Sequence, residues 1–391
     1  MYNIKILNNI SEKGLKKFNK NEFNISNNID NPDGILVRSF DMTQMEIPKT
    51  VKAIARAGAG TNNIPIDECS KKGIVVFNAP GANANAVKEI VITSILMTSR
   101  KICQSIDWVK TLKNETGDID KITEAGKKNF SGPEIQGKTL GVIGLGAIGV
   151  LVANAARKLN MNVIGYDPYL SIDAAWNLSS NVNKASSIEE IVSQSDYITL
   201  HIPLNENTKN IFNKNLLSKV KKGARLLNYA RGELVETDAV IEALSNGSLS
   251  YYVSDFPTKE LIDIENVILT PHLGASTPES EENCAEMASS EIIDFLKYGI
   301  IRNSVNFPNC YIPYTGKTRI SIANKNIPNM IGSISTVFAK HNINIDNMIN
   351  KSKGLWAYTL IDTDDINSKN NIIIDELMKI DGVVSARIIE K

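Results

Sequence analysis

Residues 139–149 have the sequence TLGVIGLGAIG, a short apolar run that leads directly into three closely spaced glycines. The run predicts a buried strand, the glycines a loop, and the residues after them a helix. In this arrangement Gly144 permits a tight turn, Gly146 lets phosphate groups approach backbone N–H groups, and Gly149 allows close contact between helix and sheet. Because a helix N-terminus attracts anions, the loop predicts a binding site for a dinucleotide pyrophosphate.

An acidic residue follows the next predicted strand, Asn162–Tyr166. Asp167 stands 18 positions after Gly149, near the spacing of about 20 residues at which such loops carry a ribose-binding carboxylate. A carboxylate there accepts hydrogen bonds from the adenosine ribose and repels a 2′-phosphate. The sequence therefore predicts NAD rather than NADP as the cofactor; the alternative is a structural glycine turn with an exposed aspartate.

The loop belongs to a longer alternation of short apolar runs and helical segments. Further strands are predicted at Tyr197–Leu200, Ala224–Asn228, Ser250–Ser254 and Asn266–Thr270. The first hundred residues alternate similarly, with strands predicted at Ile4–Leu7, Gly34–Val37, Ala53–Ala57 and Ile74–Phe77 and a long helix at Glu89–Arg100. Such alternation implies right-handed crossovers and parallel sheets with helices on both faces.

The C-terminal part has a different order. A helix predicted from Pro278 to about Tyr298 is followed by a loop with two prolines. From Arg319 the pattern becomes strand, helix, strand, strand, helix, strand, which predicts a small α+β module tethered by Cys310–Gly316. The stretch Lys113–Gln136 is polar and only weakly periodic.

The composition excludes several classes of protein. The 391 residues are enough for two to four domains, and Lys plus Arg and Asp plus Glu both number 43. The net charge therefore gives no general attraction to nucleic acid or to an anionic membrane. The four cysteines lie far apart without a CxxC pair, which argues against a zinc site and a disulfide framework. We therefore expect no metal and no nucleic-acid partner. The chain opens with a strand-like segment and has no apolar run of membrane-spanning length, so we also expect no membrane partner and a cytoplasmic location.

Polar residues follow four of the predicted strands. They are His201, Arg231, Asp255 and His272. Ligands of open α/β sheets bind outside the carboxyl ends of the strands, so we expect these side chains to meet at one edge. For His201 the alternative is a residue that only caps its strand, and for Asp255 it is an ordinary turn residue.

The chemistry of this set fits hydride transfer to or from a 2-hydroxy acid. Interconversion of hydroxyl and carbonyl needs a group that moves a proton near neutral pH, which the imidazole of His272 can do. Glu260, in the preceding segment, can hold that ring in orientation. Arg231 lies in a tight Ala-Arg-Gly turn, where its guanidinium can bind a substrate carboxylate and polarise the carbonyl oxygen.

Several stretches carry a resemblance to a known family. They are Arg56–Asn63 (RAGAGTNN), Phe77–Pro80 (FNAP), Asn228–Leu234 (NYARGEL), Pro271–Thr277 (PHLGAST) and the glycine loop. Over essentially its whole length the chain resembles the D-2-hydroxyacid dehydrogenases, and within them the phosphoglycerate dehydrogenases of serine synthesis. The resemblance implies that Arg231 binds the substrate, that Glu260 is the carboxylate partner and that His272 is the acid/base catalyst.

The resemblance also implies the domain organisation. A Rossmann-type, doubly wound parallel-sheet domain is expected to be inserted in a flavodoxin-like α/β substrate domain, and a C-terminal α+β ACT (ferredoxin-like) domain to follow. The expected bounds are 1–96 and 277–305 for the substrate domain, 97–276 for the NAD-binding domain and 316–391 for the ACT domain.

Ligand-binding residues are expected on the same basis. Those for NAD are Gly144, Gly146, Ala147, Ile148, Gly149, Asp167, His201, Ile202, Tyr229, Ala230, Asp255 and Gly274. Arg38 and Arg56 match positions that meet a substrate phosphate, and Asn83 matches one near the substrate; for Arg38 the alternative is an exposed loop arginine. In the ACT domain Asn326 and Asn344 match positions that bind an amino-acid effector, whereas Asn324 and Asn329 replace residues more typical of that pocket.

The resemblance therefore implies oxidation of 3-phospho-D-glycerate by NAD to 3-phosphohydroxypyruvate, the first step of L-serine biosynthesis. The enzymatic alternatives are family members that act on glyoxylate, hydroxypyruvate or 2-oxoglutarate, and the alternative from another class is a non-catalytic NAD-sensing protein. A homodimer formed through the cofactor domains, or a homotetramer, is expected.

Two features depart from the family. The loop Asp255–Glu260 has its Phe one position earlier than the commoner Asp-Val-Phe-x-x-Glu, and Lys88 replaces a small residue.

Overall fold

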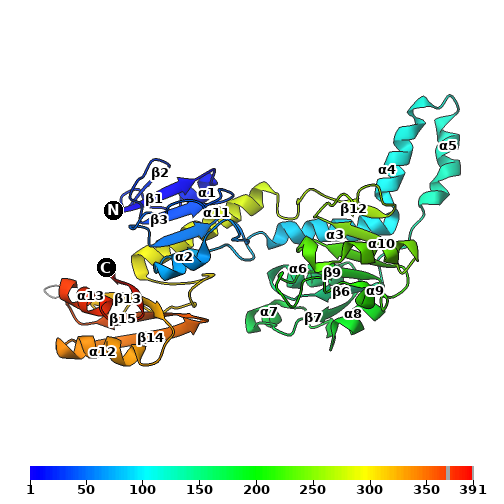
Figure 1. The fold of residues 1–391 in the computed structure, drawn as a ribbon. Helices are drawn as coiled ribbons and strands as arrows, with labels where there is room; N and C mark the ends of the chain where they lie inside the picture. Colours follow the sequence, from blue (N-terminus) through cyan, green and yellow to red (C-terminus); the bar gives the residue numbers. More distant parts are fainter. Residues whose placement is uncertain (367–369, 390–391) are drawn as a thin grey trace. The chain divides into compact units, whose positions relative to one another are not determined.

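The computed structural model describes residues 1–366 and 370–389, and the chain divides into two compact units. Unit 1 comprises Met1–Asn83 and Pro278–Lys391, and unit 2 comprises Ala84–Thr277. Residues 367–369 and 390–391, within the range expected for the ACT domain, lie outside the described residues. Each unit is built on its own sheets (Figure 1).

Unit 2 contains a seven-stranded parallel sheet with the order β12-β11-β10-β9-β6-β7-β8. Its strands are β6 (Thr139–Ile143), β7 (Asn162–Tyr166), β8 (Val182–Lys184), β9 (Tyr197–Leu200), β10 (Ala224–Asn228), β11 (Leu249–Ser254) and β12 (Val267–Leu269). Neighbouring β6 and β9 begin the two halves of the sheet, which run outward in opposite directions. Ligands of such sheets bind at this switch point, so the loops after β6 and β9 flank the expected site.

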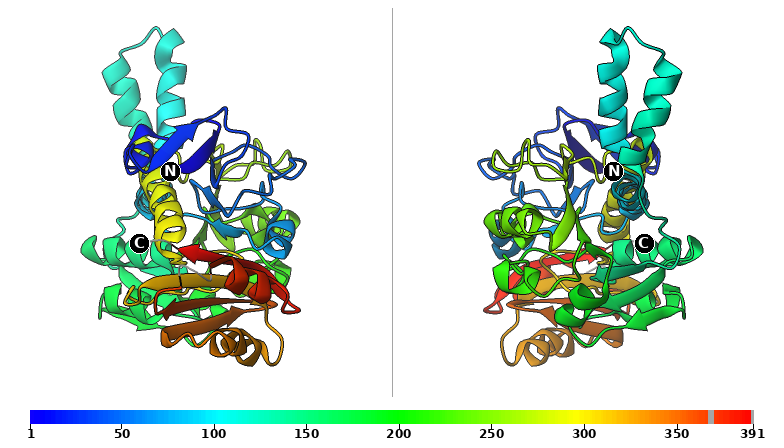
Figure 2. Two further views of the ribbon diagram at one scale, coloured as in Figure 1. Left: turned by 90° about the vertical axis from the view of Figure 1, so that its left-hand side faces the viewer. Right: turned by 90° about the vertical axis from the view of Figure 1, so that its right-hand side faces the viewer.

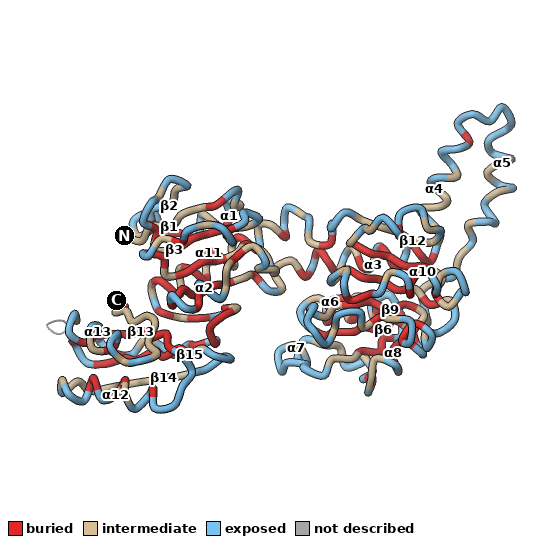
Figure 3. Tube along the Cα trace, in the orientation of Figure 1, coloured by how far each residue is buried: buried red, intermediate tan, exposed pale blue. Residues whose placement is uncertain are grey.

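Helices bury apolar residues against the sheet of unit 2, whose strands are largely buried (Figure 3). They are α3 (Ala84–Arg100), α6 (Ala147–Lys158), α7 (Ile172–Asn177), α8 (Ile188–Gln194), α9 (Lys214–Leu217) and α10 (Thr237–Ser245), with a short 3-10 turn, η3 (Gly232–Leu234). One apolar cluster includes Val91 and Val152 of α3 and α6, and another includes Ile191 and Val240 of α8 and α10. The expected domain boundary after residue 96 falls inside α3, which begins at Ala84.

A helical hairpin begins before the weakly periodic stretch Lys113–Gln136 and extends into it. It consists of α4 (Ile102–Thr111), η1 (Leu112–Asn114), α5 (Ile119–Gly126) and η2 (Lys127–Phe130). The two helices project together from the rest of unit 2 (Figures 1 and 2). Neither contains a buried residue, and the ring centroids of Trp108 and Phe130 lie 5.2 Å apart between them. The hairpin thus has little core of its own.

Unit 1 begins with a five-stranded parallel sheet in the order β2-β1-β3-β4-β5. Its strands are β1 (Tyr2–Leu7), β2 (Phe23–Ser26), β3 (Gly34–Val37), β4 (Ala53–Arg56) and β5 (Val75–Phe77), with the short helices α1 (Glu12–Leu15) and α2 (Ile66–Lys71). The chain returns to this sheet as α11 (Pro278–Tyr298), which buries Ala288 and Ile292 in the same core. The four-residue β2 and the three-residue β8 are the strands that sequence periodicity missed.

The C-terminal module has the predicted strand and helix order. Its elements are β13 (Thr318–Lys325), α12 (Met330–Lys340), β14 (Ile345–Lys353), β15 (Trp356–Thr363), α13 (Asn370–Met378) and β16 (Val383–Ile389), with an antiparallel sheet in the order β14-β15-β13-β16. The two helices bury Ile334 and Leu377 in a core of the module. Tyr358 and Leu360 of β15 instead join Phe295 of α11 in the core of the five-stranded sheet.

Two arginines, the fully buried Arg319 and the half-buried Arg387, fasten the module to the end of α11. Arg319 pairs with Asp362, with Nε 2.6 Å from Oδ1, and it donates to the carbonyl of Tyr298 at 3.2 Å. Both members of this pair are fully buried. Arg387 donates to the carbonyls of Phe295 and Leu296, where the helix leaves its last carbonyls without intrahelical partners. The module is therefore packed as part of unit 1 rather than held only by the tether.

No helix within residues 1–366 and 370–389 is long and apolar enough to cross a membrane. The same part of the chain contains no group of three or more His, Cys, Asp or Glu residues that could hold a metal ion. Its cysteines are all unpaired, and Cys69, Cys284 and Cys310 are buried.

Candidate active site

The three glycines after β6 have different surroundings. Gly144 has φ +91°, and a Cβ there would lie 2.5 Å from the carbonyl oxygen of His201. A Cβ on Gly149 would lie 1.9 Å from the oxygen of Gly144, whereas one on Gly146 would meet nothing within 4 Å. The first and third glycines are therefore required by close backbone packing, and the second leaves the N-terminus of α6 open to a ligand.

Asp167 reaches from the end of β7 to the glycine loop. Its Oδ2 accepts the N–H of Leu145 at 2.8 Å, and its Oδ1 accepts the N–H of Tyr169 at 2.8 Å. Each carboxylate oxygen has a second lone pair, so the half-buried group can still accept ribose hydroxyls. These residues fit an adenosine dinucleotide.

His201 follows β9 across the switch point. Its Nε2 lies 3.0 Å from Oγ1 of Thr199, and burial lowers the pKa of the imidazole to about 3. The ring is therefore neutral at physiological pH. The next residue, Ile202, packs beside Gly144, within 2.9 Å of where a Cβ would stand. Both residues thus adjoin the loop that the sequence assigns to the cofactor.

Asn228, the last residue of β10, shapes the turn that carries Arg231. Its buried amide donates to the carbonyl of Arg231 at 2.8 Å and accepts the N–H of Ala230 at 3.1 Å. The hydroxyl of Tyr229 lies 2.7 Å from that of Ser94 on α3. Arg231 itself is exposed, and its guanidinium donates to the neighbouring carbonyl of Ala230, at 2.7 Å.

Asp255 holds the segment around His272. The carboxylate is 1% exposed and accepts the N–H groups of Leu273 and Gly274, both at 2.7 Å, and the hydroxyl of Thr270 at 2.5 Å. His272 has φ +57°, a left-handed conformation that is uncommon for this residue type. The structure thus gives Asp255 a supporting role under the His272 segment, where the sequence suggests cofactor binding or a turn.

Phe256 links the arginine turn to the histidine. Its ring packs edge-on against His272, with ring centroids 5.1 Å apart. A Cβ on Gly232, the residue after Arg231, would lie 3.1 Å from the Cβ of Phe256. Phe256 therefore lies beside both the arginine turn and His272, and both Arg231 and His272 are exposed and follow strands of the sheet.

No hydrogen bond or ion pair joins Glu260 to His272 among the residues that the structure describes. The carboxylate is exposed, and a hydrogen bond from its own backbone N–H lowers its pKa. The predicted pairing is absent here because Glu260 lies on the open loop between β11 and β12, outside the hydrogen bonds that organise Asp255.

The two N-terminal arginines lie together in unit 1. The backbone N–H of Arg38 donates to Oδ1 of Asn8 at 3.3 Å, and its carbonyl accepts Nε of Arg56 at 3.0 Å. Arg56 also donates to the carbonyl of Gly60 at 2.5 Å. The side chain of Arg38 forms an ion pair with Glu281 in the first turn of α11. Asn83, half-buried, is the last residue of this part of unit 1.

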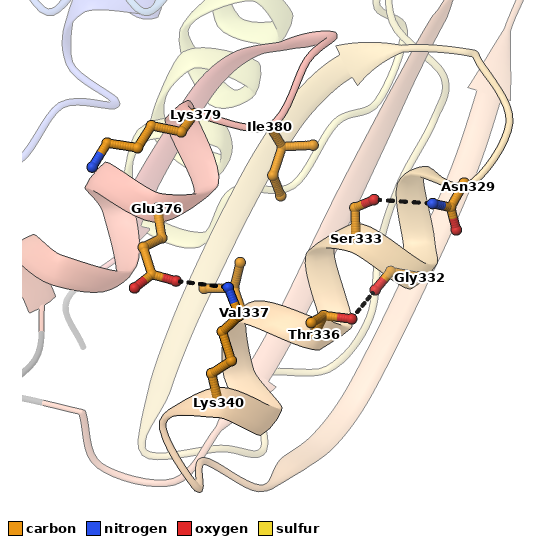
Figure 4. Close-up of a pocket in the computed structure, with 9 residues that line it drawn as sticks. All are labelled: Asn329, Gly332, Ser333, Thr336, Val337, Lys340, Glu376, Lys379 and Ile380. Carbon is orange, nitrogen blue, oxygen red and sulfur yellow. Dashed lines mark hydrogen bonds and ion pairs between the residues drawn. The ribbon is translucent and has the colours of Figure 1, made fainter.

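Pockets lie on two sides of α12 in the described part of the C-terminal module. One, of about 210 Å³, is lined by Asn324, Asn326, Ile327, Asn329, Met330, Ile331, Gly332, Asn350 and Ala357. It includes Asn326 but not Asn344, whose amide donates to Asp346 at 3.0 Å. The other, of about 650 Å³, lies between α12 and α13, where Lys340 approaches Glu376 (Figure 4).

Comparison with known proteins decides the family. Residues 92–274 match the D-isomer specific 2-hydroxyacid dehydrogenase, NAD binding domain. A D-3-phosphoglycerate dehydrogenase of Haemophilus influenzae is 31% identical over 345 residues, which cover 84% of this chain and 79% of that protein. The chain belongs to the D-2-hydroxyacid dehydrogenase family. NAD is therefore the cofactor, as the sequence predicts.

Two further members of the family are similar. A D-3-phosphoglycerate dehydrogenase of Methanocaldococcus jannaschii is 36% identical over 300 residues, or 74% of this chain and 55% of that protein. This chain thus spans about half the length of that dehydrogenase. The crystal structure of an NAD+-bound 3-phosphoglycerate dehydrogenase of Entamoeba histolytica has 28% identity and a TM-score of 0.61, covering 80% of this chain and 99% of that one. These likenesses confirm the predicted parallel-sheet α/β fold.

Proposed function

We propose that this chain is an NAD-dependent dehydrogenase that oxidises 3-phospho-D-glycerate to 3-phosphohydroxypyruvate, the first step of L-serine biosynthesis. The observation that carries the proposal is that Phe256 contacts His272 and lies beside Gly232, the residue after Arg231, in the unit that contains the dinucleotide loop. The phosphorylated substrate is supported by relatives named D-3-phosphoglycerate dehydrogenase and by the arginine pair in unit 1.

The residues divide the reaction between binding and proton transfer. NAD, when bound, supplies the acceptor for the hydride that leaves C2 of the substrate. Arg231 binds the substrate carboxylate through two parallel N–H groups and keeps C2 in place. His272 takes the proton of the C2 hydroxyl at an imidazole nitrogen as the carbonyl forms, and it returns that proton in the reverse direction.

Phosphate recognition is assigned to unit 1. We propose that Arg38 and Arg56 provide the positive charge for the substrate phosphate and that Asn83 contributes to substrate binding. Because Arg56 donates to the carbonyl of Arg38, it also fixes the backbone from which Arg38 extends. In this assignment the five-stranded part of unit 1 is the substrate domain, unit 2 the NAD-binding domain, and the four-stranded module the ACT domain.

NADH formation with a panel of acids tests the proposal. We expect turnover of 3-phospho-D-glycerate to exceed that of D-glycerate, D-lactate and D-2-hydroxyglutarate, each assayed with NAD. Faster turnover of an unphosphorylated acid would mean that this chain has the substrate specificity of a different member of the family. Binding of NAD without turnover of any acid would favour an NAD-sensing protein.

We also propose a homodimer in which the hairpin α4–α5 packs against a second copy of this chain. Ile106, Val109 and Ile119 are 51%, 53% and 43% exposed, and a hairpin whose two α-helices bury no residue has little stability by itself. The double variant Ile106→Glu, Val109→Glu should sediment as a monomer. Lys110→Glu, on the same helix, is the matched control and should stay dimeric; a dimeric double variant would overturn the proposal.

A small amino acid is the proposed effector of the four-stranded module. The pocket that contains Asn326 is lined by amide groups, and the fully buried Asn324 has an Oδ1 without a hydrogen-bond partner in the described residues. Such an atom can accept an ammonium or hydroxyl donor. We expect one of the twenty amino acids to raise the Tm of the wild type and not to raise that of Asn326→Ala. If none of the twenty raises the Tm of the wild type, the module has no amino-acid effector.

The cellular location proposed for the protein is the cytoplasm, which agrees with its unpaired thiols.

A further inference from the structure

Arg38 is held in place by contacts that leave its side chain facing α11. Its backbone is bonded to Asn8 and Arg56, as described above. The guanidinium and the carboxylate of Glu281 form an ion pair in which the two side chains are 41% and 42% exposed. The pair lies at the surface, where an ion pair contributes little stability and a competing anion can displace one partner.

The start of α11 brings acidic groups to this place. Glu279 and Glu281 belong to its first turn, where the helix dipole favours negative charge. Glu282 points to another partner, with an oxygen 2.5 Å from Nζ of Lys13. One turn further, the buried thiol of Cys284 has a pKa that burial raises and that the nearby charges of Arg56 and Arg38 lower in part. The first two turns of α11 therefore adjoin both arginines, and Glu281 is the carboxylate bonded to Arg38 among the described residues.

We propose that Glu281 is a specificity-determining residue, which occupies Arg38 in the absence of substrate and must be displaced by a phosphate group. The inference rests on the proposed function of the arginine pair. A phosphate carries up to two negative charges and three acceptor oxygens, so it replaces a single carboxylate at the guanidinium. Glu281 nevertheless competes with the phosphate and repels it, which weakens its binding.

Replacement of Glu281 by glutamine tests this role. Glu281→Gln keeps the size of the side chain and removes its charge, so the KM for 3-phospho-D-glycerate should fall about threefold to tenfold. The KM for an unphosphorylated 2-hydroxy acid should stay as in the wild type, because such a substrate has no group for Arg38. Glu282→Gln removes one charge from the same turn and is the matched control, with both KM values unchanged.

Direct titration keeps the inference separate from catalysis. Isothermal titration with 3-phospho-D-glycerate should show tighter binding to Glu281→Gln and weaker binding to Arg38→Ala than to the wild type. Weaker or equal binding to Glu281→Gln would overturn the inference, because the carboxylate would then position Arg38 or take no part. If the wild type oxidises only unphosphorylated acids, the proposed function fails, while the titration of the two variants still decides the role of Glu281.

Discussion

The carboxylate of Asp255 accepts the backbone N–H of Gly274 at 2.7 Å, two residues beyond His272. The same carboxylate accepts the N–H of Leu273 and the hydroxyl of Thr270. One buried charge thus fixes the backbone on both sides of an exposed histidine in a left-handed conformation. The position of His272 depends on this carboxylate more directly than on Glu260.

Asp255→Asn should lower kcat about 10- to 100-fold, because the amide replaces one of the two accepting oxygens by an NH2 group. The backbone N–H of either Leu273 or Gly274 then loses its acceptor, which shifts His272. Thr270→Val removes one hydrogen bond and leaves the two backbone bonds, so its kcat should fall less. Steady-state kinetics with NAD in excess checks both, and a normal kcat in Asp255→Asn would remove the supporting role.

Asp167→Ala should weaken NAD binding and narrow the preference for NAD over NADP. The variant loses the ribose acceptor and the repulsion of a 2′-phosphate, and it also frees the N–H of Leu145 in the glycine loop. The ratio of kcat/KM for the two cofactors measures the change. If that ratio stays constant while both values fall, the carboxylate holds the glycine loop in place and does not select between NAD and NADP.

The pH dependence of stability should change in Glu291→Gln. Glu291 of α11 is 6% exposed, and burial raises its pKa to about 8, with Asp294 adding to the rise. The folded protein therefore keeps a proton that the unfolded chain loses above its ordinary pKa, near 4.5. The stability due to this group is full below about pH 4.5 and is lost as the pH rises towards about 8.

The measurement is Tm at several pH values for the wild type and the variant. The glutamine cannot ionise and can still accept the amide of Asn303, which lies 2.8 Å from the native carboxyl. The Tm of Glu291→Gln relative to the wild type should therefore increase from pH 5 to pH 8.5. A constant difference would show that Glu291 ionises equally in both states.

Asp362→Asn should destabilise unit 1 by roughly 3–5 kcal/mol, because it leaves the fully buried guanidinium of Arg319 without its counter-charge. Urea unfolding followed by circular dichroism gives the change. Asp364→Asn, on the loop after β15, is a control of the same charge and should change stability little. Equal stability of both variants would mean that the pair does not fasten the module to α11.

Local pattern predicts the glycine loop and most of the sheet. Gly144, Gly146, Gly149 and Asp167 follow one another along two strands, so their arrangement depends on short-range chain geometry that the sequence displays. The order of strands and helices along the chain in the four-stranded module is predictable for the same reason. The hairpin was missed because α4 and α5 are short helices that bury no residue, and α5 lies in the polar stretch Lys113–Gln136.

Contacts between segments far apart in the chain could not be predicted from the sequence. Asn228, Phe256 and Thr270 look like ordinary strand-end residues, and their roles appear only when adjacent parallel strands bring them beside Arg231 and His272. The same holds for Arg319 and Arg387, whose partners lie on α11 and its flanking segments.

Single-turnover formation of NADH from 3-phospho-D-glycerate, by the wild type and by His272→Ala, tests the central claim most directly. With enzyme in excess over substrate, the wild type should convert the bound acid. The variant should bind NAD with similar affinity and react about 100- to 10,000-fold more slowly, because the hydroxyl proton has no acceptor. Equal rates in the two proteins, or no NADH from the wild type, would contradict the account.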